Sequence, residues 1–187
     1  AVVISDECYL ELGWDVDPIS ILNPQVTGGD VTGILAIHSL SKRSNLAGYR
    51  SAAVLGDSAL IADIVAARKH AGMLLSTPVQ VATIAALADE EHVAVQREVY
   101  HNRRVTLQNA LTDAGMRIDH SEAGLYLWTT AGIESLKLVT DLANVGILCA
   151  PGTFYGPSGD QHVRIALTAT DERIAQVGNR LTALKRG

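Results

Sequence analysis

A lysine that follows two hydroxyl side chains and precedes an arginine is the first candidate for chemistry in this sequence. The segment Ser39-x-Ser41-Lys42 comes directly after the apolar run 33–38, and Arg50 follows the lysine. Lysine seldom lies deep in a protein unless it is paired or used, and its amine can condense with an aldehyde as a Schiff base. Hydroxyl and guanidinium groups could hold a phosphate beside that amine. The set indicates a site for pyridoxal phosphate; the alternative interpretation is a solvated lysine in a loop.

A second set of polar side chains follows the apolar run 2–5 at the start of the chain. This run is continuous, as expected of a strand covered on both faces, and it leads into Asp6 and Tyr9. In open α/β sheets, ligands bind beyond the carboxyl ends of the strands, so we expect Asp6, Tyr9 and Lys42 to face one crevice. A carboxylate can keep the pyridine nitrogen protonated, which makes the ring an electron sink, and a phenol can donate to the phenolate oxygen of the ring. We predict these roles for Asp6 and Tyr9.

The order and spacing of these residues resemble the class I and II aminotransferases of pyridoxal-phosphate fold type I. The resemblance covers essentially the whole chain, and its motifs are Asp6-x-x-Tyr9, Ser39-x-Ser41-Lys42, Arg50 and Arg164 within 163–167. It implies an α/β fold that forms the C-terminal portion of such a transferase. Residues 1–92 would complete the mostly parallel sheet of the cofactor-binding large domain, and residues 93–187 would form a small α/β domain.

The resemblance also implies a role for each matching residue. Lys42 would be catalytic and would bind the cofactor covalently, and the other cofactor-binding residues would be Asp6, Tyr9, Ser39 and Arg50. For Arg164, the alternating strand pattern alone leaves open a solvent-facing side chain or a fork for a carboxylate. The resemblance favours the second interpretation, in which Arg164 binds the α-carboxylate of an amino-acid or keto-acid substrate.

Two segments in the last third of the chain, 119–128 and 150–156, resemble actinobacterial N-succinyldiaminopimelate aminotransferases. This implies amino transfer between N-succinyl-2,6-diaminopimelate and 2-oxoglutarate, with glutamate as the other amino acid, in lysine biosynthesis. Another class I aminotransferase, for aspartate or aromatic amino acids, or a C–S lyase would share every residue named above.

A different class of function is also open, that of a non-catalytic piece. Compared with the family, roughly half of the protein is absent on the amino-terminal side, which would leave an open sheet edge and an uncovered apolar face. We expect such a piece to bind the cofactor poorly by itself. Family members are usually homodimers, so the resemblance implies a homodimer of the complete protein.

The composition is that of an ordinary soluble domain. The 187 residues are 48% hydrophobic and 19% charged, with a net charge of −5, which argues against nucleic acid or an anionic membrane as partner. No apolar run approaches the ~20 residues of a membrane span. Cys8 and Cys149 lie far apart, which suits a reducing, cytoplasmic compartment, and the histidines show no spacing typical of a metal site.

Hydrophobic periodicity predicts the elements that must position these residues. A strand at 51–56, so soon after the strand at 33–38, should pair with it in antiparallel fashion. Further strands are predicted at 124–129, 147–150 and 163–167, and helices at 58–71, 77–89, 92–114, 135–145 and from Thr170 to a close at Lys185 and Arg186.

On the long helix we interpret Glu98, Arg103 and Arg104 as solvated charges. We interpret the glycine-rich segment 151–159 as turns rather than a phosphate cradle, because no helix start follows it. The helix at 77–89 should begin with a capping box and a proline at its first position.

Overall fold

The computed structural model describes residues 1–184, and Lys185 and Arg186, which were predicted to close the last helix, lie outside that range. The chain divides into two units, Ala1–Val95 and Gln96–Gly187. Each unit has its own sheet, which confirms the predicted α/β class.

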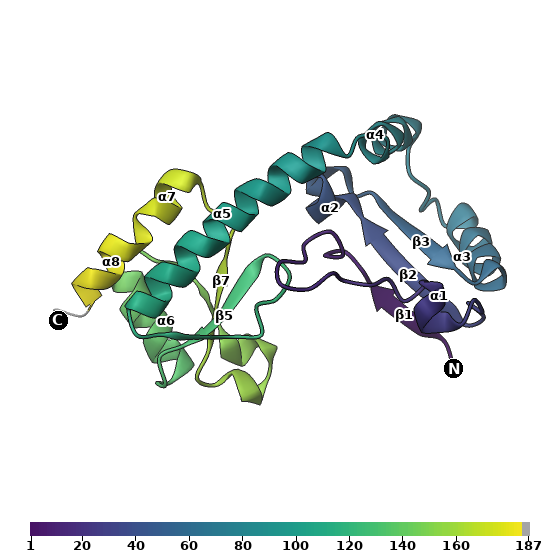
Figure 1. The fold of residues 1–187 in the computed structure, drawn as a ribbon. Helices are drawn as coiled ribbons and strands as arrows, with labels where there is room; N and C mark the ends of the chain where they lie inside the picture. Colours follow the sequence, from purple (N-terminus) through teal and green to yellow (C-terminus); the bar gives the residue numbers. More distant parts are fainter. Residues whose placement is uncertain (185–187) are drawn as a thin grey trace. The chain divides into compact units, whose positions relative to one another are not determined.

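The first unit is built on three strands in the order β1-β2-β3 (Figure 1). Strands β1 (Val3–Asp6) and β2 (Ile34–Ser39) are parallel, and β3 (Ala52–Gly56) pairs with β2 in antiparallel fashion, as the short connection predicted. In the β1–β2 register Asp6 lies opposite Ile37. The carboxyl ends of these two parallel strands therefore lie side by side.

The helices of the first unit begin at polar caps. The elements are α1 (Pro24–Thr27), α2 (Leu40–Arg43), the 3-10 turn Ala47–Tyr49, α3 (Ser58–His70) and α4 (Thr77–Leu87). Asp57 caps α3, because its carboxylate accepts hydrogen bonds from two backbone N–H groups of the first turn. The predicted capping box of α4 is wrong by one residue, since Ser76 is the N-cap and the proline stands at the second helical position.

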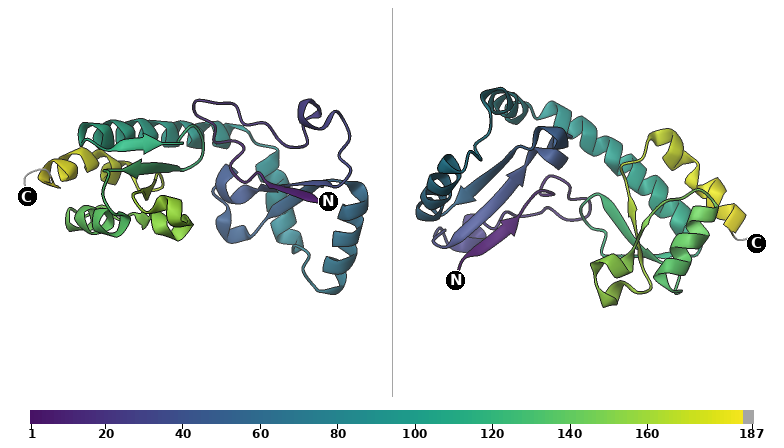
Figure 2. Two further views of the ribbon diagram at one scale, coloured as in Figure 1. Left: turned by 90° about the horizontal axis from the view of Figure 1, so that it is seen from below. Right: turned by 180° about the vertical axis from the view of Figure 1, so that it is seen from behind.

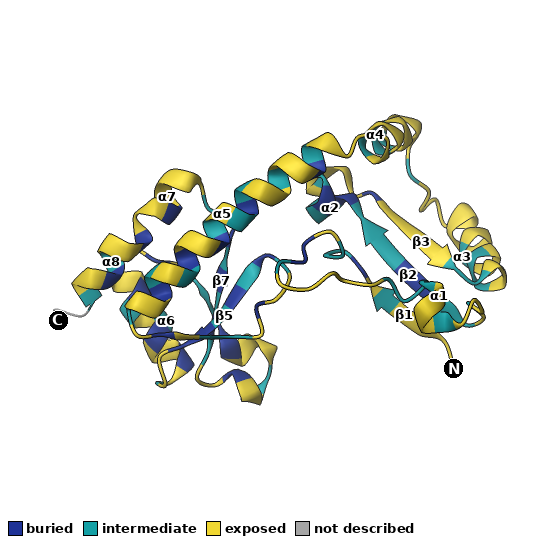
Figure 3. Ribbon diagram, viewed as in Figure 1, coloured by how far each residue is buried: buried dark blue, intermediate teal, exposed yellow. Residues whose placement is uncertain are grey.

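Strand β1 is not covered on both faces, which contradicts the expectation from its apolar sequence. Val3 is 49% exposed and Ile4 60%, and α3 and α4 have no buried residue (Figure 3). Val3 and Ile4 point to opposite faces of the strand, so both faces of β1, which pairs with β2 alone, are open to solvent. The first unit thus presents apolar side chains to solvent along β1, α3 and α4.

The second unit is an antiparallel four-stranded sheet with helices packed against it. Its strands are β4 (Arg117–Asp119), β5 (Tyr126–Thr130), β6 (Ala150–Pro151) and β7 (Val163–Ala166), in the order β4-β5-β7-β6. Its helices are the greater part of α5 (Glu91–Asp113), α6 (Ser135–Asn144), α7 (Asp171–Ala175) and α8 (Val177–Leu184). Two 3-10 turns, Gly152–Tyr155 and Pro157–Gly159, follow β6, so the interpretation of this segment as turns is confirmed.

Among residues 1–184, most of the buried side chains belong to this second unit. Helix α8 lies alongside α5 (Figure 2), and the core between the helices and the sheet is filled by Leu107, Leu111, Leu127, Leu142 and Leu181. The buried apolar side chains of α5, α6 and α8 therefore pack into this core, as burial of apolar surface favours.

Several sequence predictions for the second unit are wrong in detail. The predicted strand 147–150 is reduced to the two residues of β6, and the last helix is divided at Gln176. Strand β4 was not predicted. Arg104 is not solvated: only 6% of the residue is exposed, and its guanidinium donates to the backbone oxygen of Ser121 at 2.9 Å.

Candidate active site

Asp6 lies at the carboxyl end of β1 with its carboxylate held by the residue two positions on. The backbone N–H of Cys8 donates to Asp6 Oδ1 at 3.1 Å, and the thiol of Cys8 donates to it as well. Both hydrogen bonds lower the pKa of Asp6 below its usual value, so the side chain is an exposed carboxylate at neutral pH. Burial of the Cys8 thiol, with Asp6 beside it, raises the pKa of the thiol and keeps its proton in place.

Lys42 lies in the short helix α2, which begins where β2 ends. Ser39 is the N-cap of this helix, and its hydroxyl accepts a hydrogen bond from Ser41 N at 3.1 Å. The Lys42 amine lies 6.0 Å from the centroid of the Tyr9 ring. Lys42 is half-buried, and no residue among 1–184 forms an ion pair or a hydrogen bond with its amine. The structure therefore brings the predicted Asp6, Tyr9, Ser39 and Lys42 to one edge of the sheet.

Arg50 follows on the same loop, but its guanidinium makes contacts elsewhere. It donates to Ala47 O at 3.0 Å and borders a hollow that Ile61 and Leu75 also line. Its backbone adopts φ 54°, in the left-handed region that residues with a side chain seldom occupy. Within residues 1–184 no hydrogen bond or ion pair joins the Arg50 guanidinium to Ser39 or Lys42, so its role beside a phosphate stays a prediction.

Glu7 connects the segments that carry the cluster, a role that was not predicted from the sequence. It is only 7% exposed, and its carboxylate accepts hydrogen bonds from Ile21 N at 2.6 Å and from His38 Nε2 at 2.8 Å. Burial raises the pKa of Glu7, but these hydrogen bonds and one from the Ser20 hydroxyl outweigh it, so the pKa is lowered. The end of β1 is thereby fastened to β2 and to the long connector between them.

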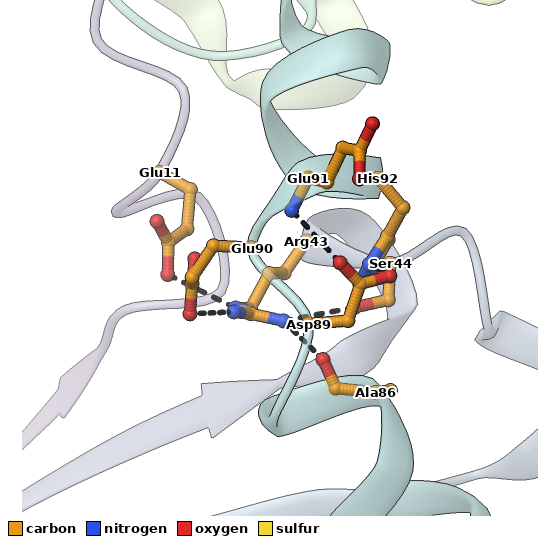
Figure 4. Close-up of polar contacts among 8 residues, drawn as sticks. All are labelled: Glu11, Arg43, Ser44, Ala86, Asp89, Glu90, Glu91 and His92. Atoms are coloured by element: carbon orange, nitrogen blue, oxygen red, sulfur yellow. Dashed lines mark hydrogen bonds and ion pairs between the residues drawn. The ribbon is translucent and has the colours of Figure 1, made fainter.

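Arg43, the residue after Lys42, fastens the same turn to α4 and to the start of α5 (Figure 4). Its side chain is 9% exposed, forms ion pairs with Glu11 at 3.3 Å and with Glu90, and donates to Ala86 O at 3.0 Å. The only sequence signal for this role is its position beside the lysine.

A cavity of about 280 Å³ opens beside the strand ends. It is lined by the segment that follows β1 and by residues of β2, α2, β3 and α4, among them Glu7, Cys8, His38, Ser39 and Thr83. Part of its polar lining, Glu7, His38 and Ser39, lies close to Asp6 and Lys42 in the chain.

The second unit holds the remaining predicted residue, Arg164, on β7. Its Cζ atom lies 4.0 Å from the ring centroid of Tyr126 and 4.9 Å from that of Tyr155. Arg164 is half-buried, and no described residue forms a hydrogen bond or an ion pair with its guanidinium. Neither tyrosine was predicted from the sequence, although strand alternation places Tyr126 on the face of Arg164.

The described residues contain no cluster of histidine, cysteine and acidic side chains that could hold a metal ion. Nor is any of the described helices both long enough and apolar enough to cross a membrane.

Comparison with known proteins places this arrangement in a family. The aminotransferase class I and II family matches residues 1–181. The chain belongs to this family, which confirms the resemblance that the motifs indicated.

Three relatives show how similar this chain is to individual aminotransferases. "Probable aminotransferase Rv1178" of Mycobacterium tuberculosis is 57% identical over 97% of this chain and 43% of its own length. "4-dedimethylamino-4-oxo-anhydrotetracycline transaminase OxyQ" of Streptomyces rimosus is 56% identical over 97% and 51%. An "LL-diaminopimelate aminotransferase" of Oleidesulfovibrio alaskensis is 31% identical over 98% and 48%.

A solved aminotransferase structure has the same fold as this chain. The structure of an aminotransferase from Staphylococcus aureus covers the whole of this chain with a TM-score of 0.87 at 28% identity, over 50% of that chain. The chain therefore spans about half the length of the curated relatives and of the solved structure that it matches.

Proposed function

We propose that this chain carries the lysine-bearing part of the active site of a pyridoxal-phosphate-dependent aminotransferase. The observation that carries the proposal is the gathering of Asp6, Tyr9, Ser39 and Lys42 at the ends of β1 and β2, with an amine that no described carboxylate neutralises. The donor set fits the cofactor, since it offers a carboxylate for a ring nitrogen, a phenol for a ring oxygen and a hydroxyl for a phosphate. When bound, pyridoxal phosphate supplies an electron sink for charge at the α-carbon of the substrate.

Each residue contributes through a property that its surroundings support. Asp6 stays ionised because Cys8 lowers its pKa, so it can hold a positively charged ring nitrogen. Lys42 is the covalent attachment point, and its amine, once released, moves a proton to and from the substrate α-carbon. The helix start at Ser39 offers its hydroxyl and backbone N–H groups to a phosphate, and we assign Arg50 to the same phosphate. Arg164 binds the substrate carboxylate through its guanidinium edge.

The attachment point can be tested directly. The protein is reduced with borohydride in the presence of pyridoxal phosphate, digested, and searched for a cofactor adduct by peptide mass spectrometry. We expect the adduct on the peptide that contains Lys42 and its absence from Lys42→Ala. An adduct that persists at the site in Lys42→Ala would refute the assignment, and Lys69→Ala serves as the control for a lysine on the exposed end of α3.

For the substrate we propose N-succinyl-2,6-diaminopimelate with 2-oxoglutarate as amino acceptor, a reaction of lysine biosynthesis. Support comes from the segments 119–128 and 150–156 and from the relatives named as LL-diaminopimelate aminotransferases. The relative named as a 4-dedimethylamino-4-oxo-anhydrotetracycline transaminase favours a different amino acceptor. Amino transfer with aspartate or aromatic amino acids, and C–S lyase chemistry, are further candidates. Initial rates with glutamate and a panel of keto acids separate these, since the physiological acceptor should have the highest kcat/KM.

We propose further that residues 1–92 complete the large cofactor-binding domain, that residues 93–187 are the small domain, and that the complete protein is a cytoplasmic homodimer. The second candidate is a non-catalytic piece, and the exposed apolar side chains of β1, α3 and α4 favour it for the 187 residues alone. The intact mass of the natural protein separates the two, because a polypeptide of about 187 residues would contradict the first. Tight stoichiometric binding of the cofactor by the isolated 187 residues would contradict the second.

A further inference from the structure

The guanidinium of Arg164 lies close to two aromatic rings, one on a neighbouring strand and one on the turn that follows the other neighbouring strand. Tyr126 lies on β5, and Tyr155 ends the 3-10 turn that follows β6; β5 and β6 are the two neighbours of β7 in the sheet. The distances from Arg164 Cζ to the ring centroids, 4.0 Å and 4.9 Å, are within the range of a cation–π contact.

The strand register explains why one of these rings is near. In the β5–β7 pair Trp128 lies opposite Arg164, and Tyr126 lies opposite Ala166. Residues two apart on a strand share a face, so Tyr126 and Arg164 are diagonal neighbours on one side of the sheet, within reach of an aromatic side chain.

Tyr155 is held in place by a second layer of aromatic contacts. Its ring meets Trp128 edge-on, with centroids 5.7 Å apart and planes at 83°. Trp128 is in turn stacked on His162 at 5.1 Å and 6°, and His162 Nε2 is 3.0 Å from Asp119 Oδ2. Tyr155 is 51% exposed, so its packing into a core does not explain this arrangement.

The backbone of the turn is fixed as well. Gly152 N donates to His162 O at 2.8 Å and to Ser135 Oγ at 2.9 Å. A methyl group on Gly152 would lie 2.2 Å from Gly159 O, so the turn has no room to shift. The start of the turn that carries Tyr155 is therefore anchored to residues next to β7.

The guanidinium that these rings flank has no anionic partner among residues 1–184. A guanidinium interacts with aromatic rings through its face, and its N–H groups point outward along its edge. Two aromatic neighbours therefore limit the positions that the guanidinium can take, and its N–H groups, which no described acceptor engages, stay available to a planar carboxylate.

We propose that Tyr126 and Tyr155 are positioning residues that hold the Arg164 guanidinium plane for the substrate carboxylate. This rests on the proposed role of Arg164 and adds a cause for its orientation. It requires that the ring of each tyrosine matter more than its hydroxyl, because the contact with Arg164 is made by the ring face.

The test compares Tyr155→Leu with Tyr155→Phe in the complete active protein. Removal of the ring should raise KM for the amino donor by about three- to tenfold and leave kcat within about twofold, since the contact acts equally in the ground and transition states. Tyr155→Phe should stay within about twofold of the natural protein. The dissociation constant of propanoate, an unreactive monocarboxylate, should rise in parallel with KM when it is measured by calorimetry.

A double-mutant cycle with Arg164→Gln separates this proposal from the role of Arg164 itself. In the Arg164→Gln background Tyr155→Leu should have no further effect on propanoate binding. If Arg164→Gln leaves propanoate binding and KM unchanged, the carboxylate-binding role fails. If Arg164→Gln weakens binding but Tyr155→Leu has the same effect with and without Arg164, only the positioning role fails, and equal losses in Tyr155→Phe and Tyr155→Leu would also overturn it. The pair Tyr126→Leu and Tyr126→Phe gives the same comparison should Tyr155→Leu not fold.

Discussion

Replacement of Arg43 by methionine tests whether the turn that carries Lys42 is held from outside the cluster. Methionine keeps an apolar stem in the buried position but removes the guanidinium, so the ion pairs with Glu11 and Glu90 and the hydrogen bond to Ala86 O are lost. We expect local loosening of α2 and of the end of α4, together with a loss of global stability.

The magnitude follows from the exposure of each partner. The side chain of Glu90 is 74% exposed and that of Glu11 39%, so water screens both pairs and each contributes at most about 0.5 kcal/mol. The charged hydrogen bond to Ala86 O is made by a side chain that is 9% exposed, and it contributes about 1.5 kcal/mol. We therefore expect Arg43→Met to lower the free energy of unfolding by about 2–3 kcal/mol.

Urea denaturation measures the global effect, and hydrogen exchange of the backbone amides in α2 and at the end of α4 measures the local one. Glu90→Gln is the matched control, since loss of an exposed partner should cost less than about 1 kcal/mol. If Arg43→Met costs less than about 1 kcal/mol and leaves hydrogen exchange in both helices unchanged, the contacts of Arg43 do not hold this turn.

Three further outcomes follow from the second unit and the loops. Gly152→Ala should destabilise the protein by about 3 kcal/mol or more, because backbone oxygens lie within 3 Å of the added methyl group, whereas Gly48→Ala meets nothing and should be nearly neutral in the same denaturation assay. Hydrogen bonds from Arg117 and His162 hold the pKa of Asp119 far below its usual value. The ionised carboxylate therefore stabilises the folded state at pH values above its unfolded pKa, which is near 3.8, and this stabilisation is lost as the pH falls. Asp119→Asn should therefore flatten the fall in melting temperature below about pH 4, and parallel curves for the two proteins would contradict this. Leu142→Ala, at a fully buried position, should cost about 2–5 kcal/mol by thermal or chemical unfolding, while Leu148→Ala, at a position 87% exposed, should stay within about 0.5 kcal/mol.

The placement of the candidate cluster could be predicted from the sequence because it depends on local order. A strand that ends in Asp6 and a strand that ends in Ser39 must meet if they are parallel neighbours, and the short loop after Lys42 forces an antiparallel partner. These inferences need only periodicity and loop length.

The remaining features depend on tertiary contacts that periodicity does not contain. Arg104 lies on what looks like the polar side of a helix, yet it is buried, and the backbone oxygen of Ser121 accepts a hydrogen bond from it. Strand β1 reads as doubly covered, but cover is a property of neighbouring elements and not of the strand itself. The sequence could not link Tyr155 to Arg164, because one residue lies on a turn and the other on a strand, and only the folded sheet brings them together.

The backbone of Arg50 has a consequence for protein engineering. A left-handed conformation costs a residue with a side chain on the order of 1 kcal/mol, and glycine would relieve that cost. A search for thermostable variants should therefore select Arg50→Gly. The same variant would lack the guanidinium that we assign to the phosphate. This one substitution would then raise the melting temperature and weaken the binding of the cofactor.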